Sequence, residues 1–360
     1  MQTRGYSGYR GRGRNKKTGL VIVLSVILVL ACLFLALQRF IVYDASGGAR
    51  FVWPGSEKKT EDATQEKVDV EVTKNRKKTI ATPRPSDKVA PSELRALTLI
   101  SDFLFASEMA EPFSLGEEND GFNTVVVCLK EANGKLHYPS KEQTAIDAGA
   151  VEATEFAAGN IRALVTSPYY TVAQVYALHD SRFAYANMPQ AALMRSDESE
   201  SIWYDTQSSF WLDPEKELTV RYLRSIVTEA ASFGFDEILL SDFCYPRSEG
   251  GNRTDLIDTD GRKMSEHAVL AQLADDLRNA VEPYGAKLAV QLCAEDILGG
   301  TDEASGVVFA ELAEIFDRVY VETTADRVPA LRAAFEGYHA VFVPILREGS
   351  VGGNCVFGIP

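Results

Sequence analysis

The sequence predicts an α/β protein: a (β/α)₈ TIM barrel carried on one transmembrane helix and a flexible linker. Three observations lead to this prediction. An uncharged apolar run lies near the N-terminus, a polar stretch rich in Lys, Glu, Thr and Pro follows it, and short apolar runs then alternate with amphipathic stretches from residue 94 onward. Repeated β–α alternation over that length is typical of a parallel sheet closed into a barrel.

Residues 1–18 form a basic tail, and residues 19–38 read as a transmembrane anchor. No residue between Lys17 and Arg39 is charged, and nineteen residues at about 1.5 Å each reach roughly 28 Å, enough to cross the hydrocarbon core. A cleaved signal peptide would have a shorter apolar run. Because basic residues precede the run, we expect the N-terminus in the cytoplasm and the C-terminal domain outside the cell membrane.

Residues 39–93 are predicted to be a flexible linker, because their composition cannot bury enough apolar surface to offset the entropy of ordering. The charge changes after them. From Leu94 to Pro360 the chain has 20 basic and 42 acidic residues. A domain this acidic would repel a phosphate backbone, so nucleic acid is excluded as a partner.

Within residues 94–360, seven runs rich in Val, Ile and Leu have the length of buried parallel strands. They are Ala96–Phe103, Thr124–Leu129, Thr171–Leu178, Glu237–Phe243, Lys287–Leu292, Arg318–Val321 and Ala340–Leu346.

Amphipathic helices are predicted between these strands at Glu215–Phe233 and Met264–Val281, the first with Asp213 and Pro214 as its N-cap and first turn. The eighth strand is either Asn354–Ile359, with no helix before it, or missing, which leaves the barrel incomplete.

No cofactor or metal site is predicted. The chain has five cysteines and four histidines, with no C-x-x-C pair and no histidine at zinc-ligand spacing from a cysteine. We expect the four cysteines after the anchor to be buried free thiols rather than disulfides. They are Cys128, Cys244, Cys293 and Cys355.

Four ordered segments resemble a bacterial family of glycoside hydrolase-type proteins with an amylase-like TIM barrel, a domain of unknown function. Residues 122–131 (FNTVVVCLKE) are similar to the family strand "l-N-a-V-V-I-D-v-K-d", and residues 170–180 (YTVAQVYALHD) to "y-P-I-A-R-I-V-v-F-K-D". Residues 202–214 contain its "l-W-x-D" and "W-v-D-P" patterns, and residues 230–238 (AASFGFDEI) match "A-x-x-l-G-F-D-E-I" closely. The resemblance implies a barrel that acts on a polysaccharide.

The chain departs from the family pattern at the positions that matter most for catalysis. Where the family has aspartate, this sequence has Cys128 on the second strand and Ser241 on the fourth; Cys244 replaces an arginine, and Gln291 stands at the family's fifth-strand aspartate. Glycoside hydrolysis uses two carboxyl groups across the scissile bond. Neutral side chains cannot replace them, so very weak or absent hydrolysis is expected.

Three acids near strand ends are the candidate catalytic residues: Asp242, Glu322 and Glu295. Active sites of these barrels are built at the carboxyl ends of the strands. Asp242 lies one residue beyond the family's aspartate, so a regular strand would turn it away from the interior unless a bulge corrects the register. The alternative for each is a solvent-facing loop acid in an acidic domain.

The candidate substrate-binding residues are Trp203, His179, Asp180, Lys130, Gln291 and Ser241. Trp203 lies in a polar loop and is favoured as a stacking platform for a sugar ring, whereas Trp211 is favoured as a packing residue at a helix start. His179 and Asp180 read either as an acid–base pair or as a helix cap. Ser241 is expected to point into the barrel.

Two functions therefore remain open. The barrel either acts on a cell-surface polysaccharide as a glycoside hydrolase, or it is a catalytically degenerate module that binds glycan or a wall-assembly partner; a structural surface protein is a third alternative. The sequence leaves the sugar, the linkage and the oligomeric state open.

Overall fold

The computed structural model describes residues 41–43, 49–51, 88–99, 101–107, 121–195, 201–247, 264–299, 305–347 and 352–357. The chain divides into two compact units, residues 1–77 and 78–360. The described part of the first unit is an antiparallel pair of short strands, β1 (Ile41–Tyr43) and β2 (Ala49–Phe51), within the segment predicted to be a linker.

The predicted basic tail and transmembrane anchor lie outside the described residues. Among the residues that are described, no helix is long and apolar enough to cross a membrane.

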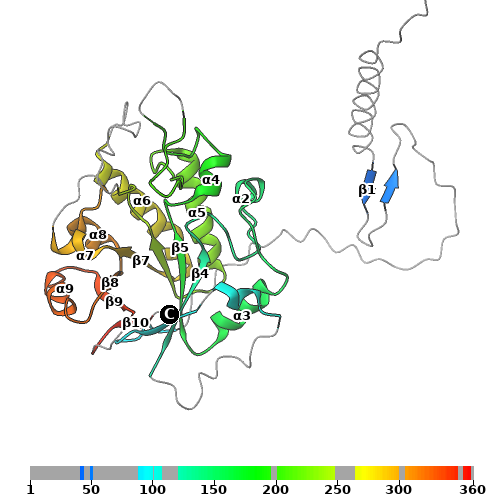
Figure 1. Ribbon diagram of the computed structural model, residues 1–360. Helices are drawn as coiled ribbons and strands as arrows, with labels where there is room; N and C mark the ends of the chain where they lie inside the picture. The colour runs from blue at the N-terminus through cyan, green and yellow to red at the C-terminus, as the bar shows by residue number, and fades with distance from the viewer. Residues whose placement is uncertain are drawn as a thin grey trace, which may run out of the picture. The chain divides into compact units, whose positions relative to one another are not determined.

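The second unit is a closed barrel of eight parallel strands in the order β10-β3-β4-β5-β6-β7-β8-β9, with helices on its outside (Figure 1). The predicted parallel barrel is thus confirmed. The strands are β3 (Arg95–Leu99), β4 (Thr124–Lys130), β5 (Tyr170–Tyr176), β6 (Glu237–Ser241), β7 (Lys287–Leu292), β8 (Arg318–Thr323), β9 (Val341–Leu346) and β10 (Cys355–Phe357). The helices are η1 (Ser101–Phe105), α2 (Gln143–Asp147), α3 (Ala157–Thr166), α4 (Ser181–Ala186), α5 (Glu217–Ser232), α6 (Glu266–Val281), η4 (Glu282–Tyr284), α7 (Ala294–Leu298), α8 (Phe309–Ile315) and α9 (Val328–Ala334).

The eighth strand, which the sequence left open, closes the barrel. Cys355 and Val356 of β10 pair with Arg95 and Ala96 of β3, and Val356 also pairs with Ile345 of β9. Only residues 347–354 connect β9 to β10, too few for the crossover helix that joins most parallel strands.

The barrel interior is a packed apolar layer to which every strand contributes one side chain. Because side chains alternate along a strand, their neighbours face outward and pack against the helices. The inward set is Ala96, Val126, Val172, Leu239, Ala289, Tyr320, Val343 and Val356. Since Leu239 points inward, Ser241, two residues later, also points inward.

A charged pair lies inside the barrel at the amino ends of the strands. The buried carboxylate of Glu237 (β6) forms an ion pair with Arg318 (β8). It also accepts hydrogen bonds from the hydroxyls of Tyr170 at 3.0 Å and Tyr320 at 2.7 Å. These donors satisfy a charge that would otherwise be very costly to bury.

Several predicted element ends differ from the structure by one to four residues, and hydrogen bonds explain two of the differences. The predicted strand Ala96–Phe103 ends at Leu99, because residues 101–105 form a 3₁₀ turn whose carbonyl groups at Phe103 and Leu104 accept hydrogen bonds from the Asn160 side chain. The helix predicted from Glu215 begins at Glu217, since the Asp213 carboxylate accepts a hydrogen bond from the Glu215 N–H in a turn that precedes the helix.

Candidate active site

A cavity of about 1280 Å³ opens at the carboxyl ends of β6, β7 and β8, the end of the barrel where active sites are built. Five of the nine predicted site residues line it: Asp242, Glu322, Glu295, His179 and Gln291. The remaining four are described below. The other polar lining residues are Asp205, Thr206, Gln207, Trp211, Cys244, Arg247, Cys293, Asp296, Thr323, Thr324, Arg327 and Arg347.

Asp242 faces the cavity even though the inward-pointing residue next to it is Ser241. The strand ends at Ser241, and the backbone of Asp242 adopts a left-handed conformation with φ 49°. This conformation breaks the alternation of side chains, so both consecutive residues point toward the barrel axis or its mouth. Positive φ is uncommon for a residue other than glycine, although aspartate tolerates it better than most. Such strain is concentrated at functional sites.

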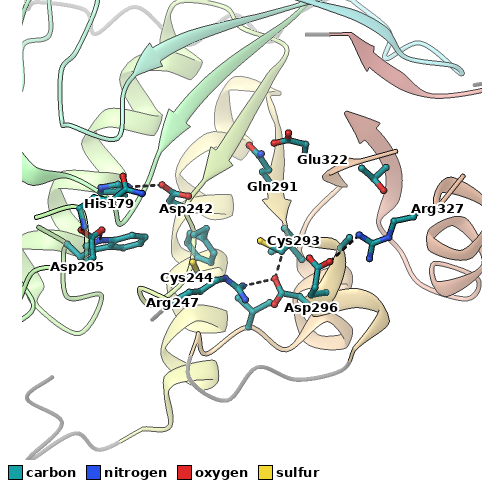
Figure 2. A pocket seen from close by; sticks show the side chains of 18 of the residues that line it. His179, Asp205, Asp242, Cys244, Arg247, Gln291, Cys293, Asp296, Glu322 and Arg327 are labelled. Carbon is teal, nitrogen blue, oxygen red and sulfur yellow. Dashed lines mark hydrogen bonds and ion pairs between the residues drawn. The ribbon is translucent and has the colours of Figure 1, made fainter. Parts of the chain in front are cut away.

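His179 holds the Asp242 carboxylate. Its Nδ1 lies 2.9 Å from Oδ2 of Asp242 (Figure 2). The imidazole ring stacks on Trp211, with ring centroids 4.4 Å apart and planes 5° apart. The Trp211 indole N–H in turn donates to Asp205 Oδ2 at 3.0 Å. His179, Trp211 and Asp205, which all line the cavity, thus form a chain of contacts that holds the Asp242 carboxylate in place.

The structure agrees with one of the two tryptophan predictions and contradicts the other. Trp211 is 7% exposed and belongs to the apolar core, so it is the packing residue that was predicted, and it also lines the cavity beneath His179. Trp203, predicted to be the stacking platform, is 4% exposed and its backbone N–H is bonded to Leu193, so it offers no open face to a sugar ring. Both tryptophans are thus buried, and of the two only Trp211 lines the cavity.

Three ion pairs line the rest of the cavity; Figure 2 shows Glu322 and Arg327 on the side opposite His179, and Arg247 with Asp296 between the two sides. Glu322 pairs with Arg347 at 2.6 Å, Glu295 with Arg327 at 3.1 Å, and Asp296 with Arg247 at 2.6 Å. Its own backbone N–H and the Arg327 guanidinium lower the pKa of Glu295. Glu295 is therefore ionised at neutral pH, and its side chain is more exposed than that of Glu322, 72% against 48%.

The floor of the cavity is uncharged, as the departures from the family pattern predict. The buried Ser241 hydroxyl donates to Gln291 Oε1 at 2.8 Å and accepts from the Gln174 amide at 2.9 Å. Burial, followed by the charge of Glu131, raises the pKa of Cys128 to about 12. Ser241 does not line the cavity itself but is hydrogen-bonded to Gln291, which does. Cys128 is a neutral thiol.

The two cysteines at the cavity are also neutral. Both are free thiols as predicted, but Cys293 is exposed rather than buried. Desolvation raises the pKa of Cys244 to about 12 and also raises the pKa of Cys293. A thiol protonated at neutral pH is a poor nucleophile and a poor metal ligand. Within the described ranges, no group of three or more His, Cys, Asp or Glu residues is placed to hold a metal ion.

Lys130 and Asp180, both predicted to bind substrate, form an ion pair away from the cavity. Their side chains are 0% exposed and lie 2.9 Å apart. Asp180 also accepts hydrogen bonds from the Phe183 N–H, where it caps α4, and from the Tyr222 hydroxyl of α5. The register of β4 shifts between Cys128 and Lys130, which turns Lys130 out of the barrel. The pair joins β4 to α4 and α5, so the helix-cap interpretation of Asp180 fits the geometry.

Replacing Gly134 with alanine is expected to destabilise the fold by about 3–5 kcal/mol, because the new Cβ would displace one partner of this buried ion pair. A Cβ at Gly134, where φ is +90°, would lie 2.1 Å from Asp180 Oδ1. Gly149→Ala is the matched control: φ there is +66° and no atom lies within 4 Å of the new Cβ. The control should cost only about 1 kcal/mol. Urea unfolding of both variants measures the difference, and equal losses would contradict the predicted clash.

A family profile described as "Putative glycosyl hydrolase domain" matches residues 106–321, well over half of the chain. The chain belongs to this family. The match includes β4 to β7 and most of β8, and therefore His179, Asp242 and Glu295. A comparison with curated proteins finds no match.

Solved structures with the same fold include the PgaB (BpsB) glycoside hydrolase domain from Bordetella bronchiseptica. It is 15% identical, with a TM-score of 0.52 over 75% of this chain and 94% of that chain. A hypothetical protein from Ruminiclostridium thermocellum is 19% identical, with a TM-score of 0.46 over 54% of this chain and 96% of that chain. At these identities the likeness concerns the fold, and the first structure supports the parallel barrel of this glycosyl hydrolase family member.

The sequence analysis missed Tyr176, although its position on β5 could have shown that it points inward, like Val172. Burial raises the pKa of Tyr176 to about 12, with further contributions from Cys128, Asp242, Glu131 and Glu322. Its phenol is thus protonated at neutral pH, and the negative charges of Asp242 and Glu322 both contribute to its raised pKa. The three arginines were also missed. Each follows a strand end within six residues, a signal that is visible only once the strand ends are known.

Proposed function

We propose that this domain hydrolyses a glycosidic bond in the cavity, with Asp242 and Glu322 as its pair of carboxyl groups. The observation that carries the proposal is the left-handed backbone of Asp242, which turns its carboxylate into the cavity at the mouth of β6. This conformation costs energy, and strained backbone of this kind is concentrated at functional sites.

The position of Glu322 supports the pairing. Glu322 lies on β8, in register with the inward residues Arg318 and Tyr320, and half of its side chain is exposed. Strands β6 and β8 are separated only by β7, so their axes lie roughly 10 Å apart. Two side chains that converge from strands this far apart reach the carboxyl separations of about 5–9.5 Å that glycoside hydrolases use.

The reaction needs one carboxyl to protonate the leaving oxygen and another to attack the sugar or to activate water. Asp242 Oδ2 is held by His179, and its Oδ1 accepts no hydrogen bond from the described residues, which leaves this oxygen for the substrate. The Tyr176 phenol, kept protonated, lies near both carboxylates, which contribute to its raised pKa. Gln291 presents an amide between the two carboxylates (Figure 2).

A second function, glycan binding without hydrolysis, is favoured by the neutral floor. Ser241, Gln174 and Gln291 satisfy one another's hydrogen bonds there, and Cys128 is a neutral thiol. An oxocarbenium-like transition state would find no carboxylate directly below it.

Product analysis separates the two functions. The full-length protein is incubated with a panel of polysaccharides, and new reducing ends and released oligosaccharides are measured. The neutral residues Cys128, Ser241 and Gln291 predicted very weak hydrolysis, but Asp242 supplies a carboxylate to the cavity, so we expect measurable cleavage of at least one polysaccharide by the wild type. Binding of a polysaccharide with no released product over prolonged incubation would overturn the hydrolase and favour the binding function.

We also propose that the chain is a single-pass membrane protein that presents the barrel outside the cell. The proposal rests on the uncharged run at residues 19–38 and its basic flank. Protease added to intact cells should remove the barrel and leave a small N-terminal fragment. A barrel protected in sealed cells would contradict the orientation, and a mature chain that starts near residue 40 would contradict the anchor.

A further inference from the structure

Three aromatic side chains, one on α4 and two on the hairpin that follows it, form a cluster on the surface. Tyr185 is 61% exposed and Tyr204 is 54% exposed, although both are large and partly apolar. The Phe210 ring, partly buried, stacks against Tyr185 with ring centroids 5.7 Å apart and planes 21° apart. We call Tyr185, Tyr204 and Phe210 the aromatic cluster.

Two of the rings share one face of a short hairpin, and Tyr185 of α4 packs against them through Phe210. Tyr204 and Phe210 are directly opposite each other in an antiparallel bridge, so their side chains point to the same side. Their sequence neighbours Asp205 and Trp211 line the cavity. Because successive side chains alternate, the aromatic cluster lies on the opposite face of the same hairpin.

The hairpin is held rigidly by hydrogen bonds. The Asp205 carboxylate accepts from the backbone N–H groups of Gln207 and Ser209, each at 2.9 Å. The Phe210 N–H donates to the Ser181 hydroxyl at 3.0 Å, which ties the hairpin to the start of α4. Rings fixed in this way lose little conformational entropy when a ligand covers them.

We propose that the aromatic cluster is a second glycan-binding surface, which holds the part of a polysaccharide chain that continues beyond the cavity over the hairpin. The choice of ligand rests on the proposed function, because the hairpin that carries the rings also forms the cavity wall. Flat aromatic rings suit the apolar faces of sugar rings, and tyrosine hydroxyls suit their hydroxyl groups. With 42 acidic against 20 basic residues in the domain, an uncharged polysaccharide fits better than a polyanionic one.

Affinity electrophoresis of the full-length protein in detergent tests the proposal, with hydroxyethyl cellulose, xylan and laminarin as uncharged probes and alginate as a polyanionic comparison. We expect at least one uncharged polymer to retard the wild type. Tyr185→Ala and Tyr204→Ala should each weaken the affinity for that polymer about five-fold, and the double variant about 30-fold. Tyr185→Phe, which keeps the ring, should retain most of the binding.

Two controls make the outcomes distinct. Phe156→Ala removes an exposed ring at the start of α3 and should leave the affinity unchanged. Asp242→Asn should also leave retardation by the polymer unchanged, because the aromatic cluster lies outside the cavity. If the wild-type protein is retarded by a polymer but releases no product from it, the proposed hydrolysis is refuted and the binding surface is not. Unchanged affinity in the tyrosine double variant, or no retardation by any of the uncharged polymers, would overturn the inference. Equal melting temperatures for wild type and variants establish that the fold is intact.

Discussion

Replacing Asp242 with asparagine is expected to lower glycan hydrolysis by about 10²–10⁴-fold, the usual effect of losing a group that transfers a proton in the transition state. Asparagine has the same shape, tolerates the left-handed backbone and can still bond to His179. The variant therefore removes the carboxylate and leaves its surroundings in place. Binding of the same glycan should change little, so the loss should appear in kcat rather than in KM.

Glu295→Gln is the matched control for Asp242→Asn. Glu295 also lines the cavity, but its carboxylate is 72% exposed and is paired with Arg327. Its loss should change kcat by less than about ten-fold, because an exposed pair contributes little. Equal kcat values for Asp242→Asn and the wild type would show that Asp242 does not take part in the reaction.

Arg318→Met is expected to destabilise the barrel by about 3–5 kcal/mol, since it leaves the Glu237 carboxylate buried without its charged partner. The Glu237 side chain is fully buried, and only the hydroxyls of Tyr170 and Tyr320 would remain to stabilise it. Urea unfolding followed by fluorescence measures the loss.

Two further variants test the cause of that loss. Lys287→Met breaks an ion pair with Asp317 that is half-exposed, and should cost no more than about 1 kcal/mol. The double variant Glu237→Gln/Arg318→Met should recover part of the stability because no charge remains buried. If the double variant is as unstable as the sum of the two single variants, the interaction between Glu237 and Arg318 is not the reason.

The barrel could be predicted because parallel strands buried on both faces leave continuous apolar runs in the sequence, as at Lys287–Leu292. The short β10 was harder to predict, since three residues carry no periodicity of their own. Its strand character comes from pairing with β3 and β9, which are about 260 and 10 residues away in the sequence. Strand ends also escaped prediction where side chains from distant segments decide them, as Asn160 does for residues 101–105.

The sequence predicts the candidate site only where the alternation of side chains along a regular strand decides which residues point inward. Alternation correctly places Ser241 inside the barrel, but it also places Asp242 outside, and the sign of one φ angle reverses that result. The ion pair between Lys130 and Asp180 joins residues fifty positions apart. Their burial depends on the β4 register shift, which leaves no mark in the residue types.

The backbone of Asp242 also places stability and activity under opposing selection. Glycine adopts φ 49° without the steric cost that any other residue has there. Selection of a variant library for heat resistance alone should therefore favour glycine at this position, and the selected variants should be more stable and catalytically inactive. Natural proteins of this family that have an acidic residue at this position would then be those in which the catalytic activity of the carboxylate outweighs the lost stability.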